Sequence, residues 1–347
     1  MTLLASTIQT LGTTKTIRKR EFRAHNARAS LSDIEKSAIK TLAYYQVLGQ
    51  YPLTALELYR YLHKESDEQI LLSFYNFLKL LEQSPAINKT VDRKNGFYFL
   101  KNNERFYHQR IFRQKVAIAK WKRTRRIALL LAACPFLRGL LVSGSLAFGN
   151  TKRQSDIDLL IITEKGRIWT CRTFLSFLLQ IIGQRRHDQV IENKICLNHY
   201  IAQNSLAVSL QNISNAHLYS HLIPLINYQN FWLFQEQNSW IARLLFSYPQ
   251  SKQNCLRRIN EESLIFKLAS LLGRGLELFL CGFPGRLLER KLAAWQTKRI
   301  HQKTNWRALK EEQLHLGEGS LLFHYPICRN AQVMNEYRKK VQALKLT

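Results

Sequence analysis

The fold is decided by the segment Leu141-Val-Ser-Gly-Ser-Leu-Ala-Phe-Gly-Asn-Thr-Lys-Arg-Gln-Ser-Asp-Ile-Asp-Leu-Leu-Ile-Ile162. An apolar run before Gly144 predicts a strand that leads into a tight turn, and the run 159–162 predicts a buried strand. Gly144 has no Cβ, so a phosphate group can approach its backbone closely, and Ser145 adds a hydroxyl donor. If a helix begins at this turn, its free amides also favour an anion.

A spacer of ten residues separates Ser145 from two carboxylates, Asp156 and Asp158, which flank Ile157. In a strand, residues i and i+2 point to the same face, so the two carboxylates are expected to converge beside the turn. Like charges this close are unfavourable unless a cation neutralises them. Hard oxygen ligands beside a triphosphate indicate Mg²⁺, in a two-metal arrangement for in-line displacement.

The combination of Gly144-Ser145, the ten-residue spacer and Asp156-Ile-Asp158 in apolar surroundings resembles the nucleotidyltransferase signature of the DNA polymerase beta superfamily. The resemblance covers about residues 125–205. It implies an α+β fold with a small mixed-sheet nucleotidyltransferase core. It also implies that Gly144, Ser145 and Ser155 bind the nucleotide, and that Asp156 and Asp158 are catalytic ligands of Mg²⁺.

The third carboxylate of that superfamily usually lies on a following strand. The apolar segment 194–201 is the expected counterpart, and the polar residue at its centre is Asn198. An asparagine can ligate a metal through its carbonyl but cannot accept a proton as a carboxylate does. Asn198 is therefore the third expected catalytic residue, with His199, Glu192 or Asp188 as alternative bases. Because phosphoryl transfer depends mainly on positioning and electrostatics, positioning alone is a further alternative.

Residues 31–102 predict three short helices followed by a hairpin. Capping signatures begin at Ser32, Thr54 and Ser66, and Asn95-Gly96 is a strong hairpin signal. This order resembles a winged-helix domain, which binds DNA through its third helix or serves as a docking or substrate-orienting module. Residues 1–30 are basic and rich in Ser and Thr, which predicts a disordered tail, although an organelle transit peptide has the same composition.

The chain of 347 residues has 52 Lys and Arg against 24 Asp and Glu, a formal net charge of +28. Such an excess favours polyanionic partners: a nucleoside triphosphate, and RNA or another polyanionic acceptor. Residues 105–155 contain twelve Lys and Arg and no acid. The basic helix expected over 110–126 leads into the core assigned to residues 103–210, and it could form a positive wall of the same cleft.

Residues 211–347 are expected to form a helical C-terminal domain, with helices over 214–226, 231–246, 261–281 and 286–300 and a turn at 282–285. Six basic residues in this region line either an acceptor groove or a solvated helix face: Arg286, Arg290, Lys291, Lys298, Arg299 and Lys303. The six cysteines include no CxxC pair, as in a cytoplasmic protein with reduced thiols. No transmembrane segment is expected, although the apolar stretch 264–283 leaves peripheral membrane binding open.

These observations favour a Mg²⁺-dependent nucleotidyltransferase that moves a nucleoside monophosphate from a nucleoside triphosphate to a hydroxyl acceptor. The acceptor is not fixed by the sequence. The alternative is a catalytically weak, nucleotide-binding regulatory protein whose winged-helix-like module contacts DNA or a protein partner. The position of Asn198 favours this alternative.

Overall fold

A computed structural model of the chain describes residues 31–64, 72–187, 190–248, 257–303, 314–323 and 329–346. The expected basic tail at 1–30, the capping signature at Ser66 and the alternative base Asp188 all lie outside these residues. The described part combines helices with two sheets, one three-stranded and one six-stranded. This confirms the expected α+β class.

The N-terminal module contains four helices and a three-stranded antiparallel sheet of order β1-β3-β2. Its elements are α1 (Leu31–Gly49), β1 (Leu53–Thr54), α2 (Ala55–Arg60), α3 (Phe74–Gln83), α4 (Pro85–Thr90), β2 (Val91–Lys94) and β3 (Phe97–Leu100). The capping box expected at Thr54 is present, because Thr54 accepts from the Glu57 amide while the Glu57 carboxylate accepts from the Thr54 amide. The Asn95-Gly96 turn joins β2 to β3, which confirms the hairpin.

Two helix starts in this module differ from the expectation. Helix α1 already includes Ser32, so this residue is not its cap. Helix α3 begins after Ser73, whose hydroxyl accepts from the Asn76 amide. The cap at Ser73 was missed because no Glu or Gln follows it at the third helical position, so it lacks the reciprocal half of a capping box.

A six-stranded mixed sheet of order β7-β4-β5-β6-β9-β8 forms the centre of the molecule. Its strands are β4 (Leu137–Val142), β5 (Ile157–Thr163), β6 (Ile195–Ala202), β7 (Ile223–Ile226), β8 (Leu314–Leu316) and β9 (Ser320–Phe323). Strands β5 and β6 are parallel and are connected through α7 (Ile168–Ile181), whereas the other neighbouring pairs are antiparallel.

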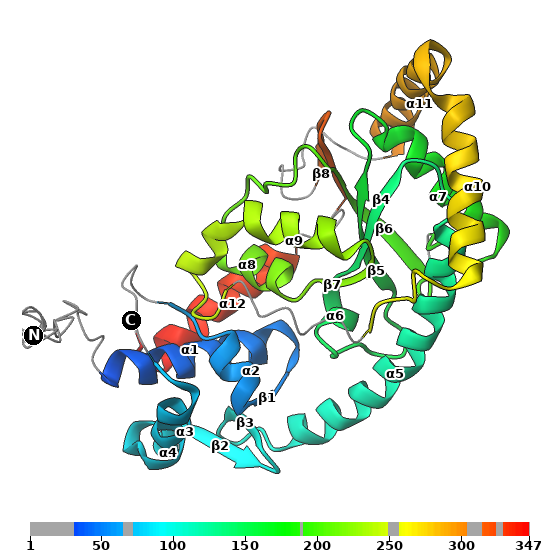
Figure 1. Ribbon diagram of the computed structural model, residues 1–347. Coiled ribbons are helices and arrows are strands. Elements are labelled where there is room, and N and C mark those ends of the chain that lie inside the picture. Colours follow the sequence, from blue (N-terminus) through cyan, green and yellow to red (C-terminus); the bar gives the residue numbers. More distant parts are fainter. Residues whose placement is uncertain are drawn as a thin grey trace, which may run out of the picture.

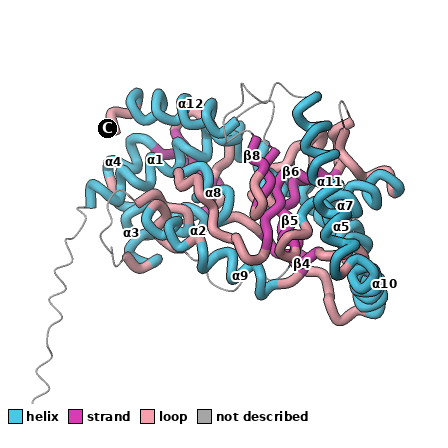
Figure 2. Tube along the Cα trace, turned by 90° about the horizontal axis from the view of Figure 1, so that it is seen from above, coloured by secondary structure: helices cyan, strands magenta, loops and turns pink. Residues whose placement is uncertain are grey.

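Helices cover both faces of this sheet (Figures 1 and 2). One face carries α5 (Arg105–Leu131), α7, α10 (Leu264–Leu280) and α11 (Gly282–Lys303), and the other carries α8 (Ile213–Ser220), α9 (Tyr228–Gln237) and the 3-10 helix η1 (Ser239–Arg243). Along β5, Ile157, Leu159 and Ile161 pack in the first core, whereas Leu160 and Ile162 pack in the second. By the same alternation Asp158 faces the α8 side.

Three strands in residues 211–347, β7, β8 and β9, differ from the expectation of a helical C-terminal domain. The end of the helix expected over 214–226 is strand β7, which lies at an edge of the sheet, where Pro224 is tolerated. Strand β9 pairs with β6, so the sheet extends past the expected boundary at residue 210. The turn expected at 282–285 is instead the first turn of α11.

The last described helix of the chain packs against the N-terminal module. Helix α12 (Arg329–Ala343) packs on α1 (Figure 1). Its residue Val333 is buried in the module's core. The long helix α5 runs from the module to the central sheet and supplies side chains to both. Among the described helices, none combines the length and the apolar character that crossing a bilayer requires.

Candidate active site

The turn after β4 holds the backbone of Gly144 against Asp158. Gly144 has a φ of +62°, and a Cβ at this position would lie 2.4 Å from Asp158 Oδ2. The Ser143 amide donates to the Asp158 carbonyl at 3.0 Å, which joins the turn to the start of β5. Both the left-handed conformation and the missing side chain are therefore required here, and they let the carboxylate reach the turn.

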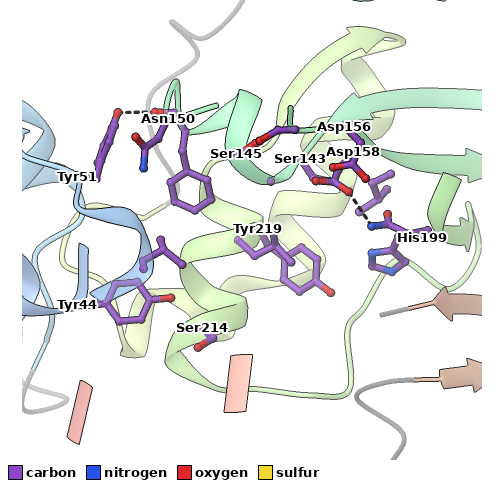
Figure 3. A pocket seen from close by; sticks show the side chains of 17 residues that line it. Tyr44, Tyr51, Ser143, Ser145, Asn150, Asp156, Asp158, His199, Ser214 and Tyr219 are labelled. Carbon is purple, nitrogen blue, oxygen red and sulfur yellow. Dashed lines mark hydrogen bonds between the residues drawn. The ribbon is translucent and has the colours of Figure 1, made fainter. Parts of the chain in front are cut away.

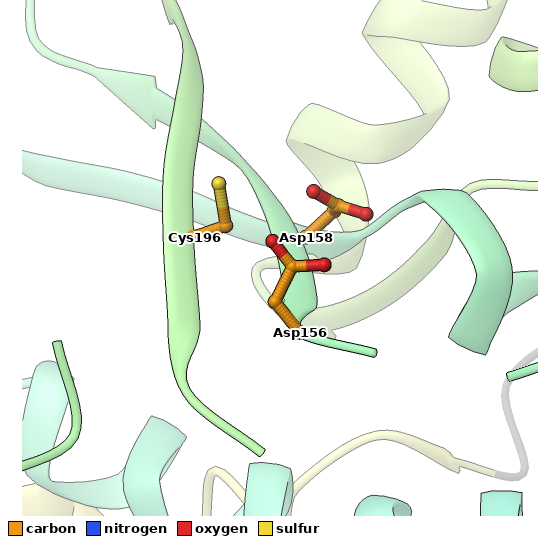
Figure 4. A group of neighbouring side chains, drawn as sticks. All are labelled: Asp156, Asp158 and Cys196. Carbon is orange, nitrogen blue, oxygen red and sulfur yellow. The ribbon is translucent and has the colours of Figure 1, made fainter. Parts of the chain in front are cut away.

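Asp156 and Asp158 converge as the i, i+2 spacing predicts, and Cys196 of β6 joins them (Figure 4). One potential ligand atom from each of the three residues lies within 4.8 Å of the other two. Cys196 is the register partner of Asp158 in the parallel β5–β6 pair. Sequence reasoning missed this cysteine because only the strand register, which no local pattern shows, places it opposite the carboxylates.

The carboxylates are held in a polar but partly dehydrated environment. Burial, with a smaller contribution from the charge of Asp156, raises the pKa of Asp158 to about 7. Arg186 Nη1 forms an ion pair with Asp156 Oδ2 at 2.5 Å, and the same nitrogen lies 3.4 Å from Cys196 Sγ. Arg186 thus supplies positive charge beside the two neighbouring carboxylates.

Asn198 adjoins the pair and lies in hydrogen-bond contact with it. Its Nδ2 donates to Asp158 Oδ1 at 3.0 Å, so its amide contacts the carboxylate as a hydrogen-bond donor. The register of β5 and β6 shifts here, since Leu159 pairs with Leu197 and Leu160 with His199. This bulge leaves Asn198 as an extra residue, and it lets both Asn198 and His199 line the same cavity.

A cavity of about 250 Å³ opens beside the carboxylates. All six residues expected at the site line it: Gly144, Ser145, Ser155, Asp156, Asp158 and Asn198. The other walls come from α1 of the N-terminal module, through Tyr44 and Leu48, and from α8, through Ser214, Leu218 and Tyr219. Tyr44 and Ser214 lie at the end of the cavity away from the carboxylates (Figure 3).

The hydroxyl groups of Ser155 and Ser214, which both line the cavity, differ in their hydrogen bonding. Ser155 Oγ accepts from the Lys152 amide at 3.2 Å and so closes the turn that precedes Asp156. Ser214 is 4% exposed, and its Oγ has no hydrogen-bond partner among the described residues. An unpaired buried hydroxyl is costly, so Ser214 is a candidate contact for a molecule in the cavity.

The basic helix α5 contributes structural contacts rather than the expected positive cleft wall. Three of its cationic residues are buried: Arg110, Arg113 and Lys120. Arg110 Nη2 pairs with Glu57 Oε1 at 2.6 Å, and Arg113 Nη1 donates to Asn150 Oδ1 at 2.8 Å. Lys120 Nζ donates to the carbonyls of Arg153 and Ser155, which fixes the loop before Asp156.

The remaining candidates lie outside the cavity. The basic residues of α11 do not line it, because α11 packs on α7 at the opposite face of the sheet. Glu192 also does not line it and accepts from the Asn193 side chain. Of the alternative bases that the structure describes, His199 alone reaches the cavity. The side chain of Lys303 lies outside the described residues.

The donor set fits a divalent cation. Two neighbouring carboxylates, Asp156 and Asp158, supply hard oxygen ligands, while Cys196 would add a softer sulfur. Comparisons of the chain with protein-family models, with curated proteins and with solved structures gave no match.

Proposed function

We propose that the chain is a metal-dependent nucleotidyltransferase with a core of the DNA polymerase beta type. It would transfer a nucleoside monophosphate from a nucleoside triphosphate to a hydroxyl acceptor and release pyrophosphate. The observation that carries the proposal is the contact of the Asp158 carboxylate with the Gly144 turn, with Asp156 beside it at the mouth of a cavity. In this arrangement a turn that would bind phosphate lies beside a pair of carboxylates that would bind the metal.

Asp156 and Asp158 would hold the divalent ion, which when bound neutralises phosphate charge and orients the triphosphate. The backbone at Gly144 leaves room for a phosphate, and the Ser145 hydroxyl lies at the same turn. Helix α6 (Gly144–Ala147) has only four residues, so backbone amides and the hydroxyl, rather than a helix dipole, would make these contacts. The acceptor oxygen would then bond to the α-phosphorus as the bond to the pyrophosphate oxygen breaks, and the hydroxyl proton would pass to His199 or to solvent.

The far end of the cavity suits a flat or partly apolar group. Tyr44 supplies an aromatic ring there and Ser214 the unpaired hydroxyl. Tyr219 lines the cavity nearer to the carboxylates, beside His199 (Figure 3). About 250 Å³ is near the lower end of ligand sites, which span about 300–1,000 Å³. We therefore favour a small-molecule hydroxyl over an RNA end as acceptor, with the nucleoside or the acceptor against the two tyrosines.

A second candidate function is nucleotide binding with little turnover, in a regulatory protein whose N-terminal module contacts DNA or a partner. It is supported by the third position of the site, where Cys196 and Asn198 stand in place of a carboxylate. The loss of a general base costs about 10²–10⁴-fold in rate. His199 is the described residue best placed to replace that base, since it lines the cavity next to Asn198.

Pyrophosphate release tests the two candidates against each other. The full chain is incubated with Mg²⁺ or Mn²⁺ and each of ATP, GTP, CTP and UTP, with panels of small hydroxyl acceptors and with RNA. The proposed function requires release that is lost in Asp156→Ala and in Asp158→Ala. Metal-dependent nucleotide binding without release, in the wild type and in Asn198→Asp alike, would favour the second candidate. If neither release nor binding is found, both candidates are wrong.

A further inference from the structure

The hairpin of α10 and α11 carries a large apolar face that the core does not use. Leu264, Leu268, Leu272 and Phe279 recur at helical spacing along α10, and all are exposed. The opposite side of α10 is the one that packs, since Gly273 lies against the carbonyls of Ala132 and Ala133. One side of this helix is therefore partly buried against the core, and an apolar stripe faces outward.

The apolar face is strongest at the tip of the hairpin. Leu278, Phe279 and Phe283 are 75%, 85% and 69% exposed, which places three large side chains where the two helices meet. The hairpin lies at the end of the molecule away from the N-terminal module and projects beyond the sheet (Figure 1). Single exposed apolar residues are common, but a continuous set on a projecting hairpin indicates a binding surface.

Positive charge borders this face, and within residues 257–303 no unpaired acid balances it. Six exposed basic residues of the hairpin form no ion pair among the described residues: Arg274, Arg286, Arg290, Lys291, Lys298 and Arg299. Arg274 lies one turn from Leu271 and Leu278, and Arg286 lies one turn from Phe283, so the charges border the apolar stripe.

The acids of residues 257–303 are all engaged. Glu261 pairs with Arg258, Glu262 with Lys267, and Glu277 with Arg138. Glu289 accepts from the amides of Trp169 and Thr170 at the start of α7. The outward side of the hairpin is therefore apolar at its centre and cationic at its border.

We propose that this hairpin face binds an anionic lipid surface, with the tip residues in the interface and the basic residues on the lipid phosphates. Apolar side chains beside free Lys and Arg are the combination that lies in the plane of a membrane interface. A second copy of this chain is a less suitable partner for the hairpin face. Its own basic residues would lie against the basic border of this face, and each chain carries a net charge of +28, so the two copies would repel each other. Nucleic acid explains the charge but not the leucine and phenylalanine side chains.

Vesicle flotation with the full chain tests this proposal. Vesicles of phosphatidylcholine alone are compared with vesicles that also contain phosphatidylglycerol. The triple variant Leu278→Ser/Phe279→Ser/Phe283→Ser removes the tip, and Arg274→Glu/Arg286→Glu reverses two border charges. Tyr75→Ser is the matched control, because Tyr75 is 64% exposed on α3 in the N-terminal module.

We expect the wild type and Tyr75→Ser to float with the anionic vesicles. Each hairpin variant should bind these vesicles at least about tenfold more weakly than the wild type. Added salt should weaken wild-type binding. Equal flotation of the wild type and the triple variant overturns the proposal, as does a lack of flotation in the wild type. A concentration-dependent dimer that the triple variant loses would identify a second copy as the occupant. RNA binding that only the charge variant loses would identify nucleic acid.

Discussion

At the scale of single residues, Gly144 and Gly96 form a matched pair. Both have positive φ, +62° and +79°, so alanine strains the backbone at either position by about 1–2 kcal/mol. A Cβ at Gly144 would lie 2.4 Å from Asp158 Oδ2, whereas a Cβ at Gly96 would meet nothing within 4 Å. We expect both Gly→Ala variants to lose stability in urea denaturation, and Gly144→Ala to lose more, because its Cβ also displaces the Asp158 carboxylate. Only Gly144→Ala should lose metal-dependent nucleotide binding, by about tenfold or more. If both variants bind the nucleotide equally well, the close approach of Asp158 to the Gly144 turn does not contribute to binding.

Asp158 makes the metal-free protein sensitive to pH. Its pKa of about 7 lies above the ordinary 3.8 because the carboxyl is buried beside Asp156. The folded state therefore holds this proton more tightly than the unfolded state does. The resulting contribution to the free energy of unfolding is fully present below about pH 4 and is lost as the pH rises to about 7. In EDTA at pH 8, Asp158→Asn should be more stable than the wild type by about 1–3 kcal/mol.

Thermal denaturation with and without Mn²⁺ checks this prediction. Mn²⁺ should raise the melting temperature of the wild type and leave that of Asp158→Asn unchanged. If the variant is less stable than the wild type at pH 8 in EDTA, the carboxylate has a purely structural role.

Cys196 should influence which metal the site prefers. Its sulfur lies in the same cluster as Asp156 and Asp158, and sulfur ligands favour borderline and soft metals over Mg²⁺. Burial raises the pKa of the Cys196 thiol, so a metal that binds the sulfur must displace its proton. We expect Cys196→Asp to shift the ratio of Mg²⁺-supported to Mn²⁺-supported nucleotide binding toward Mg²⁺ by about tenfold. Cys196→Ser is the control for the loss of sulfur alone, and an unchanged ratio in both variants would place the metal away from β6.

At the scale of elements, helix α5 holds the loop that carries the site. Lys120 Nζ donates to the carbonyls of Arg153 and Ser155, while Lys122 on the same helix is exposed. Lys120→Met leaves two loop carbonyls without this donor and should cost about 1–3 kcal/mol of stability and weaken nucleotide binding. Lys122→Met should stay within about 0.5 kcal/mol of the wild type. If Lys120→Met and Lys122→Met change the free energy of unfolding equally in urea denaturation, other contacts hold the loop.

Local signals in the sequence predicted the elements that local chemistry determines. The Asn95-Gly96 hairpin, the Thr54 capping box, the turn at Gly144 and the strand with Asp158 each follow from neighbouring residues. Strand β7 was mistaken for the end of a helix because four apolar residues show no period. Its pairing with β4, which is far away in the sequence, decides its conformation.

In the candidate site, too, neighbouring residues predict some features, whereas others depend on segments that are distant in the sequence. The i, i+2 spacing placed the two aspartates together, but Cys196 depends on strand register and the donor role of Asn198 depends on a bulge. Tyr44 and Ser214, which form the far end of the cavity, come from helices more than a hundred residues apart in the chain. No local pattern could reveal those walls.

At the scale of the whole molecule, buried histidines join the N-terminal module to the sheet domain. His63 Nε2 lies 2.8 Å from His217 Nε2, and the Tyr45 hydroxyl lies within 3.2 Å of ring nitrogens of His217 and His221. His221 also stacks on Tyr61, with ring centroids 3.7 Å apart. Because Tyr44 of the same module lines the cavity, this interface positions one wall of the site.

We expect this interface to weaken in acid. Burial lowers the pKa of His63 and of His221 to about 3, from an ordinary 6.5, so the folded state keeps these rings neutral. Their contribution is present above about pH 6.5 and is lost as the pH falls toward about 3, opposite in sign to that of Asp158. Melting temperatures across this range should fall less steeply in His221→Phe, whereas His108→Phe, at an exposed position on α5, should follow the wild type. Parallel curves for all three proteins would contradict this account.

The central claim, that Asp156 and Asp158 hold a divalent cation against a triphosphate bound at the Gly144 turn, is tested most directly by calorimetry. Non-hydrolysable analogues of the four ribonucleoside triphosphates are titrated into the full chain with Mn²⁺, with Mg²⁺ and with EDTA. We expect at least one analogue to bind only when metal is present, and Asp156→Asn and Asp158→Asn each to weaken that binding by about tenfold or more. Binding that is equally tight in EDTA, or equal in the wild type and both variants, would contradict the claim.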